Sequence, residues 1–461
     1  MEEMQGAKGR GSRRRVGLRF AAALMVVLSA TASVAPAVTS AQTDPADLTG
    51  DLLWWGWTPT ADLANTMIAG FNEVYPNVKV TFVSQPIDSY DSVLGPALTS
   101  SKGPDVFNVA PGSLNGGVSQ FAPGAIDMTP AIEAALGPDW KSMVAPAGVD
   151  PMTVDGKLVG LQAGAVYSGW MWINQDIFDE YGLTAPTTMD EWKSVCSTLE
   201  ENGVGCFVQG AGQWAFDMDT FEAIVENIEP DLYTQAANGN VEWTDPRFVQ
   251  AMEIWKSLFD EGIMQEGAVG LMQYPDANNL FLSGKYGMVM MGSWYTSNTV
   301  KDAMVNGMTA AGVSDPTPIT IMPIPFPDLA GTGKTGTMFG DADYGLAVSA
   351  KSSQQEAAQA FATWITTSQE GQQVVANTLN LIPALKGVGA QWDQIDLVNP
   401  DVQLEALQNY QEVAVSSISQ RLGNVSADLN SAFRDALIGV ATGDKTPEEA
   451  VQILQAVQDA G

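Results

Sequence analysis

Histidine is absent from this sequence of 461 residues, and cysteine occurs only twice. The absence of histidine excludes Ser-His-Asp and Cys-His catalysis, histidine-ligated zinc and haem, and imidazole proton shuttles. The two cysteines, Cys196 and Cys206, are too few for a thiolate cluster. These absences exclude more enzyme classes than any motif in the chain supports. We expect a protein without catalytic residues, metal or cofactor, while hydrolysis by carboxylates stays open because it needs no histidine.

Basic residues are scarce as well, with 21 Lys and Arg against 53 Asp and Glu. Six of the basic residues fall within residues 1–41, beside only two acidic ones, so the rest of the chain carries a formal charge of −36. A chain this acidic repels nucleic acid and anionic lipid. We therefore expect no nucleic-acid partner and favour a ligand that is neutral or is bound by a few local charges.

Long hydrophobic runs are missing too. The apolar run Phe20–Ala30 follows an Arg-rich start and is too short for a comfortable membrane span. Small residues come next, with Thr39 and Ala41 at the recognised cleavage positions, so residues 1–41 are predicted to be a secretion signal. Ser12–Arg15 hints at a twin-arginine signal, but the residues that follow fit this pattern poorly, and the signal type stays open.

The chain that follows the signal has the length and the patterning of an α/β protein with two lobes. At 461 residues the chain exceeds one ordinary hydrophobic core, and its apolar content of 45% is that of a globular protein. Residues 51–55 predict a strand, residues 63–74 predict an amphipathic helix, and residues 78–83 predict a second strand.

Three tryptophans follow one another closely in the first predicted strand and the turn after it. Trp54 and Trp55 are adjacent, so their side chains point to opposite faces of a sheet. One of them is therefore expected in the core. We expect Trp55, together with Trp57 in the turn, to lie nearer a ligand.

The stretch Leu280–Asn298 is the one around which the rest of the chain is organised. A helix end is predicted at Leu280–Leu282, and the apolar run Tyr286–Met291 is predicted to be a buried strand because it is short and bounded by glycines. In an open α/β sheet the segment beyond a strand's carboxyl end faces the ligand crevice. Trp294, which follows Gly292, offers a flat apolar face there, although a place in the core is the alternative.

This stretch, a helix end followed by GK-x-G-M and then GSW, resembles the signature of family 1 extracellular solute-binding proteins. These are the sugar-capturing subunits of ABC importers, related to maltose-binding protein. The resemblance implies a periplasmic-binding-protein fold, with two α/β lobes joined by crossover hinge strands. It also implies that Trp294 stacks on a sugar ring, that the partners are a carbohydrate and the permease subunits in the membrane, and that the chain is a monomer.

Weaker landmarks of the same family follow in the expected order. They include Pro104–Val106, which resembles a PDV entry to a strand, and Ile173–Asp176, which resembles the family's crossover strand. The resemblance runs from about residue 48 to residue 461. It implies a first lobe made of residues 48–160 and 331–383, and a second lobe made of residues 161–330 and of the C-terminal helices at 384–461.

The resemblance also suggests which residues contact the ligand. Besides the aromatic residues named above, it favours Asn108 after the PDV strand, Tyr167 at the hinge and Trp214 after a strand. Asp341 and Asp343 are suited to hold sugar hydroxyls, because each carboxylate accepts several hydrogen bonds. The expected ligand-binding residues are Trp55, Trp57, Asp105, Asn108, Tyr167, Trp214, Trp294, Tyr295, Asp341, Asp343 and Tyr344.

Several of these assignments have a structural alternative. Asp105 also suits a turn or a helix cap, and Trp214 equally suits the core. The aromatic and acidic contacts that maltose-binding protein makes beyond the PDV motif cannot be carried over, because Val109 and Gly112 stand there. Arg421 has the reach for a ligand crevice, with a surface ion pair as the alternative.

The two cysteines are expected to pair. Cys196 falls late in a predicted helix and Cys206 opens the following strand, and in an exported protein such a pair most simply forms a disulfide. No cysteine stands at the predicted cleavage site, where Gram-positive members of the family usually carry a lipid-anchored one. The location of the exported protein therefore stays open: it is periplasmic, freely secreted, or held at the membrane by an uncleaved signal.

Two other classes of function are possible on sequence grounds. A secreted glycoside hydrolase needs only two carboxylates and no histidine, but no segment singles out a pair among the many acids. An adhesion or scaffold protein is disfavoured, because the aromatic residues gather at strand ends and form no repeats. A P-loop at Gly333-Lys334-Thr335 is excluded, because Asp328 stands where its first glycine is required.

Overall fold

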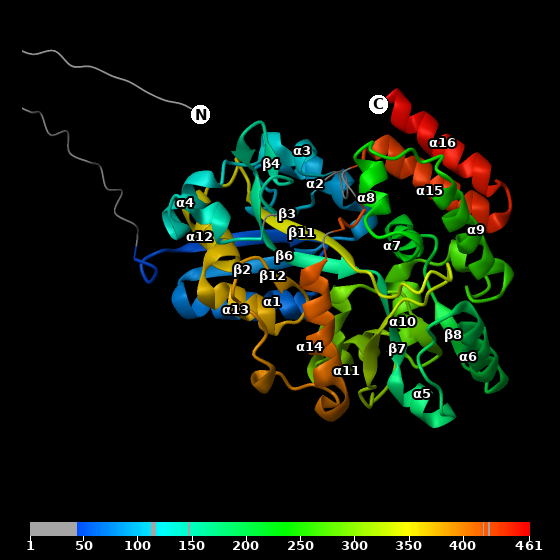
Figure 1. The fold of residues 1–461 in the computed structure, drawn as a ribbon. Coiled ribbons are helices and arrows are strands. Elements are labelled where there is room, and N and C mark those ends of the chain that lie inside the picture. The colour runs from blue at the N-terminus through cyan, green and yellow to red at the C-terminus, as the bar shows by residue number, and fades with distance from the viewer. Residues whose placement is uncertain (1–43, 112–116, 146–147, 418, 423–424) are drawn as a thin grey trace, which may run out of the picture. The chain divides into compact units, whose positions relative to one another are not determined.

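The structure is a computed structural model that describes residues 44–111, 117–145, 148–417, 419–422 and 425–461 (Figure 1). The predicted secretion signal at residues 1–41 lies outside the described residues. The described chain alternates helices and strands, and its strands form two mixed sheets and one small hairpin. The fold class is therefore α/β, as the sequence predicts.

The first sheet has the strand order β12-β6-β11-β3-β1-β2. In it β1 runs parallel to β2 and β3, while β11 runs antiparallel to both β3 and β6. Its strands are β1 (Gly50–Gly56), β2 (Val78–Ser84), β3 (Val106–Val109), β6 (Gly160–Ser168), β11 (Phe339–Val348) and β12 (Ile382–Pro383).

The second sheet has the strand order β10-β7-β9-β8. Alternate residues of its strands face two different hydrophobic cores, because side chains alternate between the faces of a sheet. Its strands are β7 (Trp170–Asn174), β8 (Gly205–Val208), β9 (Tyr286–Val289) and β10 (Ile321–Pro325), and a separate hairpin is formed by β4 (Thr153–Val154) and β5 (Lys157–Leu158).

The chain passes from the first sheet to the second through a single residue, Gly169, which lies between β6 and β7. Its φ of +96° is in the region that glycine adopts without strain, and a Cβ there would lie 2.4 Å from the carbonyl oxygen of Thr337. Only glycine fits this turn. The predicted boundary between the lobes, at residue 160, falls at the start of β6, and the division into lobes stays a prediction.

Helices pack against both sheets. Among those near the first sheet, α1 packs against β2 and α12 packs against β6 and β11; near the C-terminus, α15 and α16 lie side by side (Figure 1). The helices are α1 (Ala61–Val74), α2 (Tyr90–Leu98), α3 (Gly117–Phe121), α4 (Thr129–Leu136), α5 (Gln175–Tyr181), α6 (Met189–Glu201), α7 (Trp214–Ile228), α8 (Leu232–Ala237), α9 (Pro246–Asp260), α10 (Asn278–Leu282), α11 (Lys301–Ala310), α12 (Gln355–Thr367), α13 (Gln369–Asn377), α14 (Pro400–Ser416), α15 (Ala427–Thr442) and α16 (Pro447–Ala460). In the described part of the chain, none of them is long and apolar enough to cross a membrane.

Three hydrophobic cores hold these elements together. The first core surrounds the first sheet and includes Trp54 and Phe361. The second and third cores lie on opposite faces of the second sheet, so that Met171 of β7 packs in the second core and its neighbour Trp172 packs in the third. One half-buried side chain, Trp294, packs against both the first and the third core, and so lies where the two sheets' cores meet.

The elements predicted for the opening of the chain are confirmed. The strands expected at residues 51–55 and 78–83 are β1 and β2, and the helix expected between them is α1. The strand expected at Tyr286–Met291 is β9, which ends two residues earlier than predicted. Trp54 is fully buried in the first core while Trp55 is only half-buried, so the assignment of Trp54 to the core is confirmed.

The predicted pairing of the cysteines is also confirmed. A disulfide joins Cys196 on α6 to Cys206 on β8, and both residues are buried in the second core. The bond closes a short loop between a helix and the strand that follows it. Such a bond stabilises the fold chiefly by restricting the unfolded chain.

We expect the variant Cys196→Ala/Cys206→Ala to lose about 3 kcal/mol of unfolding free energy, the amount that the chain-entropy model gives for so short a loop. The measurement is urea unfolding of the wild type and the variant, each with and without a reductant. The reductant should lower the wild-type midpoint toward that of the variant and leave the variant unchanged. Two free thiols in the denatured, unreduced wild type would contradict the pairing.

Candidate functional site

Trp294 lies directly beyond the carboxyl end of β9, at the start of the 3₁₀ helix η8 (Ser293–Thr299). The glycine before it makes this position possible. A Cβ at Gly292 would lie 2.2 Å from the ring of Trp294 and 2.5 Å from the carbonyl oxygen of Tyr167. Because that atom is missing, the indole folds back against the end of the strand, next to the chain of the first sheet.

Other aromatic side chains surround Trp294. Its Nε1 donates to the hydroxyl of Tyr274 at 3.1 Å, and the ring of Phe216 is edge-on to it with centroids 6.1 Å apart. The hydroxyl of Tyr274 also donates to Sδ of Met291 at 3.4 Å, so this ring is held from two sides. Tyr274 is 37% exposed, which leaves part of a fixed aromatic ring open to solvent.

A guanidinium group covers the ring of Trp294. Cζ of Arg421 lies 4.9 Å from the ring centroid, within the range of a cation–π interaction. Arg421 also forms a bidentate ion pair with Asp219 of α7, through Nε at 2.7 Å and Nη2 at 2.9 Å. The side chains are 10% and 1% exposed, so the ion pair is buried. Burial raises the pKa of Asp219, and the nearby guanidinium opposes this rise.

Residues 419–422, which carry Arg421, are fixed by side chains of α7 and α8. Oγ of Ser419 donates to Glu226 at 3.0 Å, and the backbone N–H of Leu422 donates to Glu222 at 3.1 Å. The carbonyl oxygen of Leu422 accepts from the hydroxyl of Tyr233 at 3.2 Å. Arg421 therefore belongs to a segment whose backbone and side chains are both held on the buried acidic side of α7.

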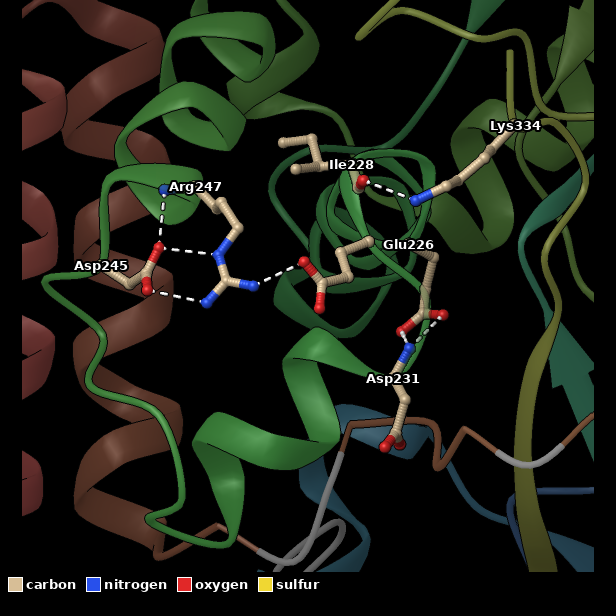
Figure 2. Close-up of polar contacts among 7 residues, drawn as sticks. Glu226, Ile228, Asp231, Asp245, Arg247 and Lys334 are labelled. Carbon is tan, nitrogen blue, oxygen red and sulfur yellow. Dashed lines mark hydrogen bonds and ion pairs between the residues drawn. The ribbon is translucent and has the colours of Figure 1, made fainter. Parts of the chain in front are cut away.

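The carboxylates of α7 are shifted toward their protonated forms. Burial raises the pKa of Asp217 and of Glu222 well above the ordinary values, and raises that of Glu226 to about 7. Figure 2 shows Glu226 accepting from the backbone N–H of Asp231, a contact that lowers its pKa. Beside it, Nζ of Lys334 donates to the carbonyl oxygen of Ile228 at 3.1 Å, where a cation complements the carboxyl end of the helix.

The strands β6 and β11 bring a second set of polar groups near Arg421. Tyr167 of β6 pairs with Gly340 of β11, where a Cβ would lie only 2.1 Å from the tyrosine ring, so the half-buried ring lies across the glycine. Burial raises the pKa of Tyr167, and the carboxylate of Asp341 adds to this effect. Tyr167 is also tied to η8, because its N–H donates to Oγ of Ser293 at 2.9 Å.

The strand β11 contains an irregularity at Asp343. Pairing with β6 shifts by one residue between Ala342 and Tyr344 and shifts back between Tyr344 and Gly345, so the register is locally irregular at Asp343 without a net extra residue. Burial raises the pKa of Asp341 to about 7 and that of Asp343 to about 6, while the charge of Arg421 opposes both shifts. Both carboxylates thus lie within electrostatic reach of the guanidinium that covers Trp294.

An aromatic group of the first sheet adjoins Asp343. Tyr344 is fully buried, and its ring meets that of Trp57 edge-on with centroids 6.3 Å apart. Trp57 in turn meets Tyr90 at 5.0 Å. A ring contact therefore joins Trp57 to Tyr344. Asp343, which is next to Tyr344 in the chain, interacts electrostatically with the guanidinium of Arg421. The structure brings together the predicted site residues Trp57, Tyr167, Trp294, Asp341, Asp343 and Tyr344.

Three other predicted site residues have their polar atoms engaged within the protein. Oδ1 of Asn108 accepts from Nε1 of Trp54 at 2.9 Å, and its Nδ2 donates to the carbonyl oxygen of Thr58 at 2.6 Å. Asp105 precedes β3 at the other end of that strand and accepts from the N–H of Leu53 and from Ser352. Both contacts are long-range, so Asp105 joins β1 to the segment before α12 and does not have the local turn or cap role that the sequence left open.

Tyr295 is 1% exposed and its hydroxyl donates to Asn278 at 3.1 Å, so it packs in the third core. Trp55 is half-buried against the first core. The side chain of Trp214 lies outside the described residues, although its backbone opens α7. Contact with a ligand stays a prediction for all eleven residues.

Sequence reasoning did not select Phe216 or Tyr274, and it left Arg421 undecided. These residues come from α7, the π turn at Gln273–Ala277 and the segment before α15. Their meeting at Trp294 depends on tertiary packing, and no local motif marks it. Among the described residues, no group of three or more acidic or cysteine side chains is placed to hold a metal ion.

Comparison with known proteins identifies the family. The model for bacterial extracellular solute-binding proteins matches residues 57–372. An uncharacterized ABC transporter extracellular-binding protein of Pyrococcus horikoshii is 24% identical over 187 residues, which are 39% of this chain and 40% of that protein. A putative binding protein of Brucella abortus is 26% identical over 187 residues, which are 38% of this chain and 42% of that protein. The chain thus matches about two fifths of the length of each relative.

Solved structures share the fold at lower identity. One comes from work on xylan utilization by Caldanaerobius polysaccharolyticus, with a TM-score of 0.68, 21% identity, and coverage of 88% of this chain and 99% of the other. A chitin oligosaccharide binding protein has a TM-score of 0.67 and 21% identity, and the match covers 89% of this chain and 98% of that one. Maltose-bound MalE3 of T. maritima has a TM-score of 0.67 and 18% identity, and the match covers 90% of this chain and 100% of that one. These similarities show the two-lobed fold of periplasmic sugar-binding proteins.

The family match covers well over half of the sequence, and the fold agrees with it: this chain belongs to the bacterial extracellular solute-binding protein family.

Proposed function

We propose that the chain is the exported substrate-binding subunit of an ABC importer, and that it captures a carbohydrate, most simply an oligosaccharide, for delivery to the permease. The observation that carries this proposal is the group of aromatic rings and polar side chains around Trp294, where the cores of the two sheets meet. Aromatic faces suit the apolar faces of sugar rings, and carboxylates and guanidinium groups suit their hydroxyls. The similar structures described as binding maltose or chitin oligosaccharide support this class of ligand.

Closure of the lobes over the ligand would link binding to delivery. Members of this fold class close by a hinge motion around their ligands. In this chain Nδ2 of Asn306 on α11 donates to Asp62 on α1 at 2.8 Å, a contact between helices that pack near different sheets. We propose that such contacts form as the lobes close, so that the permease recognises the closed, loaded state by population shift.

The cellular setting is also a proposal. The family is extracellular, and we propose that residues 1–41 direct export, that the lobes divide as the sequence predicts, and that the protein works as a monomer outside the membrane. The relatives and similar structures are described as binding proteins, so we propose binding without turnover and do not propose the glycoside hydrolase.

We expect at least one of maltotriose, xylotriose and triacetylchitotriose to raise the melting temperature of the wild type, because a ligand that binds the folded state stabilises it by mass action. Trp294→Ala should weaken the affinity for that sugar at least tenfold, equivalent to about 1.4 kcal/mol, in a calorimetric titration.

Trp392→Ala is the control for the loss of a half-buried indole, since Trp392 lies in the 3₁₀ helix Trp392–Gln394 and packs against the third core, whereas Trp294 packs against both the first and the third core. It should keep the wild-type affinity. An unchanged affinity in Trp294→Ala would remove this indole from the site, and hydrolysis of the sugar during the titration would contradict a pure binding function.

The affinity for a neutral sugar should rise with pH. In the ligand-free chain the pKa of Asp341 is about 7 and that of Asp343 about 6. A sugar hydroxyl that donates to an ionised carboxylate favours the ionised form, so below these values a proton must first be lost. If binding requires the ionised form of Asp341, we expect the dissociation constant to be about a hundredfold larger at pH 5 than at pH 8, and to level off above about pH 8.

The double variant Asp341→Asn/Asp343→Asn is the control for this pH dependence. It retains Glu226, whose pKa is also about 7, so any slope due to the acidic side of α7 remains. The variant should bind more weakly and lose most of the slope. A wild-type affinity that does not change between pH 5 and pH 8 would contradict the involvement of the two carboxylates.

A further inference from the structure

Met291 lies at the end of a chain of hydrogen bonds that reaches Trp294. Its Sδ accepts from the hydroxyl of Tyr274 at 3.4 Å, and the oxygen of that hydroxyl accepts from Nε1 of Trp294 at 3.1 Å. Met291 is 1% exposed and packs in the third core, just beyond β9. A buried thioether sulfur is thus connected to the half-buried indole of the candidate site through one hydroxyl group.

The chemistry of the three groups allows only one direction for these hydrogen bonds. A thioether sulfur has no hydrogen to donate, and an indole N–H does not accept. The hydroxyl of Tyr274 must therefore point its hydrogen at Met291 and offer a lone pair to Trp294. Burial raises the pKa of Tyr274 above its ordinary value, so the phenol keeps this hydrogen at neutral pH.

A glutamine holds the sulfur from a second side. Nε2 of Gln273 donates to Sδ of Met291 at 3.4 Å and to the carbonyl oxygen of Met290 at 3.0 Å. Its Oε1 accepts from the N–H of Gly210 at 2.7 Å. Gln273 is fully buried, so water does not compete for these partners. The sulfur therefore has a fixed place relative to β9 and to the loop between β8 and α7.

The backbone of the turn that carries Tyr274 is fixed by the same loop. The N–H of Tyr274 donates to Oε1 of Gln213 at 3.2 Å, and a Cβ at Gly210 would lie only 2.0 Å from the backbone nitrogen of Gln273. The loop before α7 therefore holds one end of Tyr274, and Met291 holds the other end through the hydroxyl.

We propose that Met291 is a positioning residue of the candidate site, which holds the indole of Trp294 in place through the hydroxyl of Tyr274. Its effect on binding rests on the proposed function, whereas the hydrogen bonds exist without a ligand. The indole N–H and the phenol hydrogen are both used inside the protein, so these two side chains offer a ligand their rings and no free donor. A ring that is held in advance loses little freedom on binding, which preserves affinity.

The variant Met291→Leu separates this role from the filling of space in the third core. Leucine and methionine have similar volumes and exchange with little loss of stability, but leucine has no acceptor for the hydroxyl of Tyr274. If Met291 only fills space, neither the indole of Trp294 nor the affinity should change. If it positions the indole, both should change while the melting temperature stays close to that of the wild type.

The first measurement needs no ligand and follows the indole N–H of Trp294 by NMR in protein labelled with ¹⁵N-tryptophan. The signal of Trp294 is the one that is missing in Trp294→Phe. We expect this N–H to exchange with deuterium at least about threefold faster in Met291→Leu and about tenfold faster in Tyr274→Phe than in the wild type. An exchange rate in Met291→Leu equal to that of the wild type would overturn the proposal.

The second measurement is the affinity for the trisaccharide that stabilises the wild type. The dissociation constant should increase about threefold to fivefold in Met291→Leu. The double variant Met291→Leu/Tyr274→Phe should bind as Tyr274→Phe does, because the sulfur acts only through the hydroxyl. Losses that add up in the double variant would contradict this route.

A rescue variant and a control complete the set. Met291→Gln places an amide oxygen that accepts from Tyr274, so it should recover most of the wild-type affinity, although the buried amide lowers the melting temperature. Met288→Leu is the control, since Met288 is fully buried on the same strand but packs in the second core. It should change neither the exchange rate nor the affinity, and a loss as large as that of Met291→Leu would point to packing alone.

The outcomes separate this proposal from the proposed function. If none of the three trisaccharides binds the wild type, the carbohydrate function fails, and the role of Met291 in binding fails with it. If a sugar binds and Met291→Leu exchanges faster but keeps the wild-type affinity, the hydrogen bonds hold the indole and only their role in binding is wrong.

Discussion

The buried ion pair between Asp219 and Arg421 is the interaction on which the site depends. Taking both charges out of water is unfavourable, and the two parallel hydrogen bonds of the guanidinium offset that cost. Breaking such a pair from one side typically costs about 3–5 kcal/mol, because the remaining charge is buried alone. In this chain the pair also joins α7 to the segment before α15, and it holds a cation over the ring of Trp294. It therefore sets both the local stability and the polarity of the surface that a ligand would meet.

Two glycines let the surrounding groups approach this pair. Gly292 allows the indole of Trp294 to fold against the end of β9, and Gly340 allows the ring of Tyr167 to cross β11. The pairing of β11 with β6 is then irregular at Asp343, next to the buried Tyr344. Backbone features that look unremarkable one at a time thus assemble rings, carboxylates and a guanidinium from distant parts of the chain. The proposal that this arrangement binds a ligand by complementarity agrees with membership of a solute-binding family.

The sequence predicts the elements of this fold better than it predicts the site. Apolar alternation and helical spacing are local, so β1, α1, β2 and β9 were predictable, as was the disulfide across a helix–strand turn. The opposite faces of Trp54 and Trp55 followed from strand geometry alone. The site was harder because its members meet only after packing: Phe216, Tyr274 and Arg421 carry no local signal for their contact with Trp294. Spacing also cannot show that Asp105 and Tyr295 already bond to protein groups.

A crystal structure of the chain with a bound neutral trisaccharide would test the central claim most directly. The account predicts one sugar ring beside Trp294, with the carboxylate of Asp341 or Asp343 within hydrogen-bond distance of a ring hydroxyl, and with the bidentate ion pair between Arg421 and Asp219 intact. A sugar bound away from these residues, or an Arg421 that has left Asp219 and turned out of the site, would contradict it.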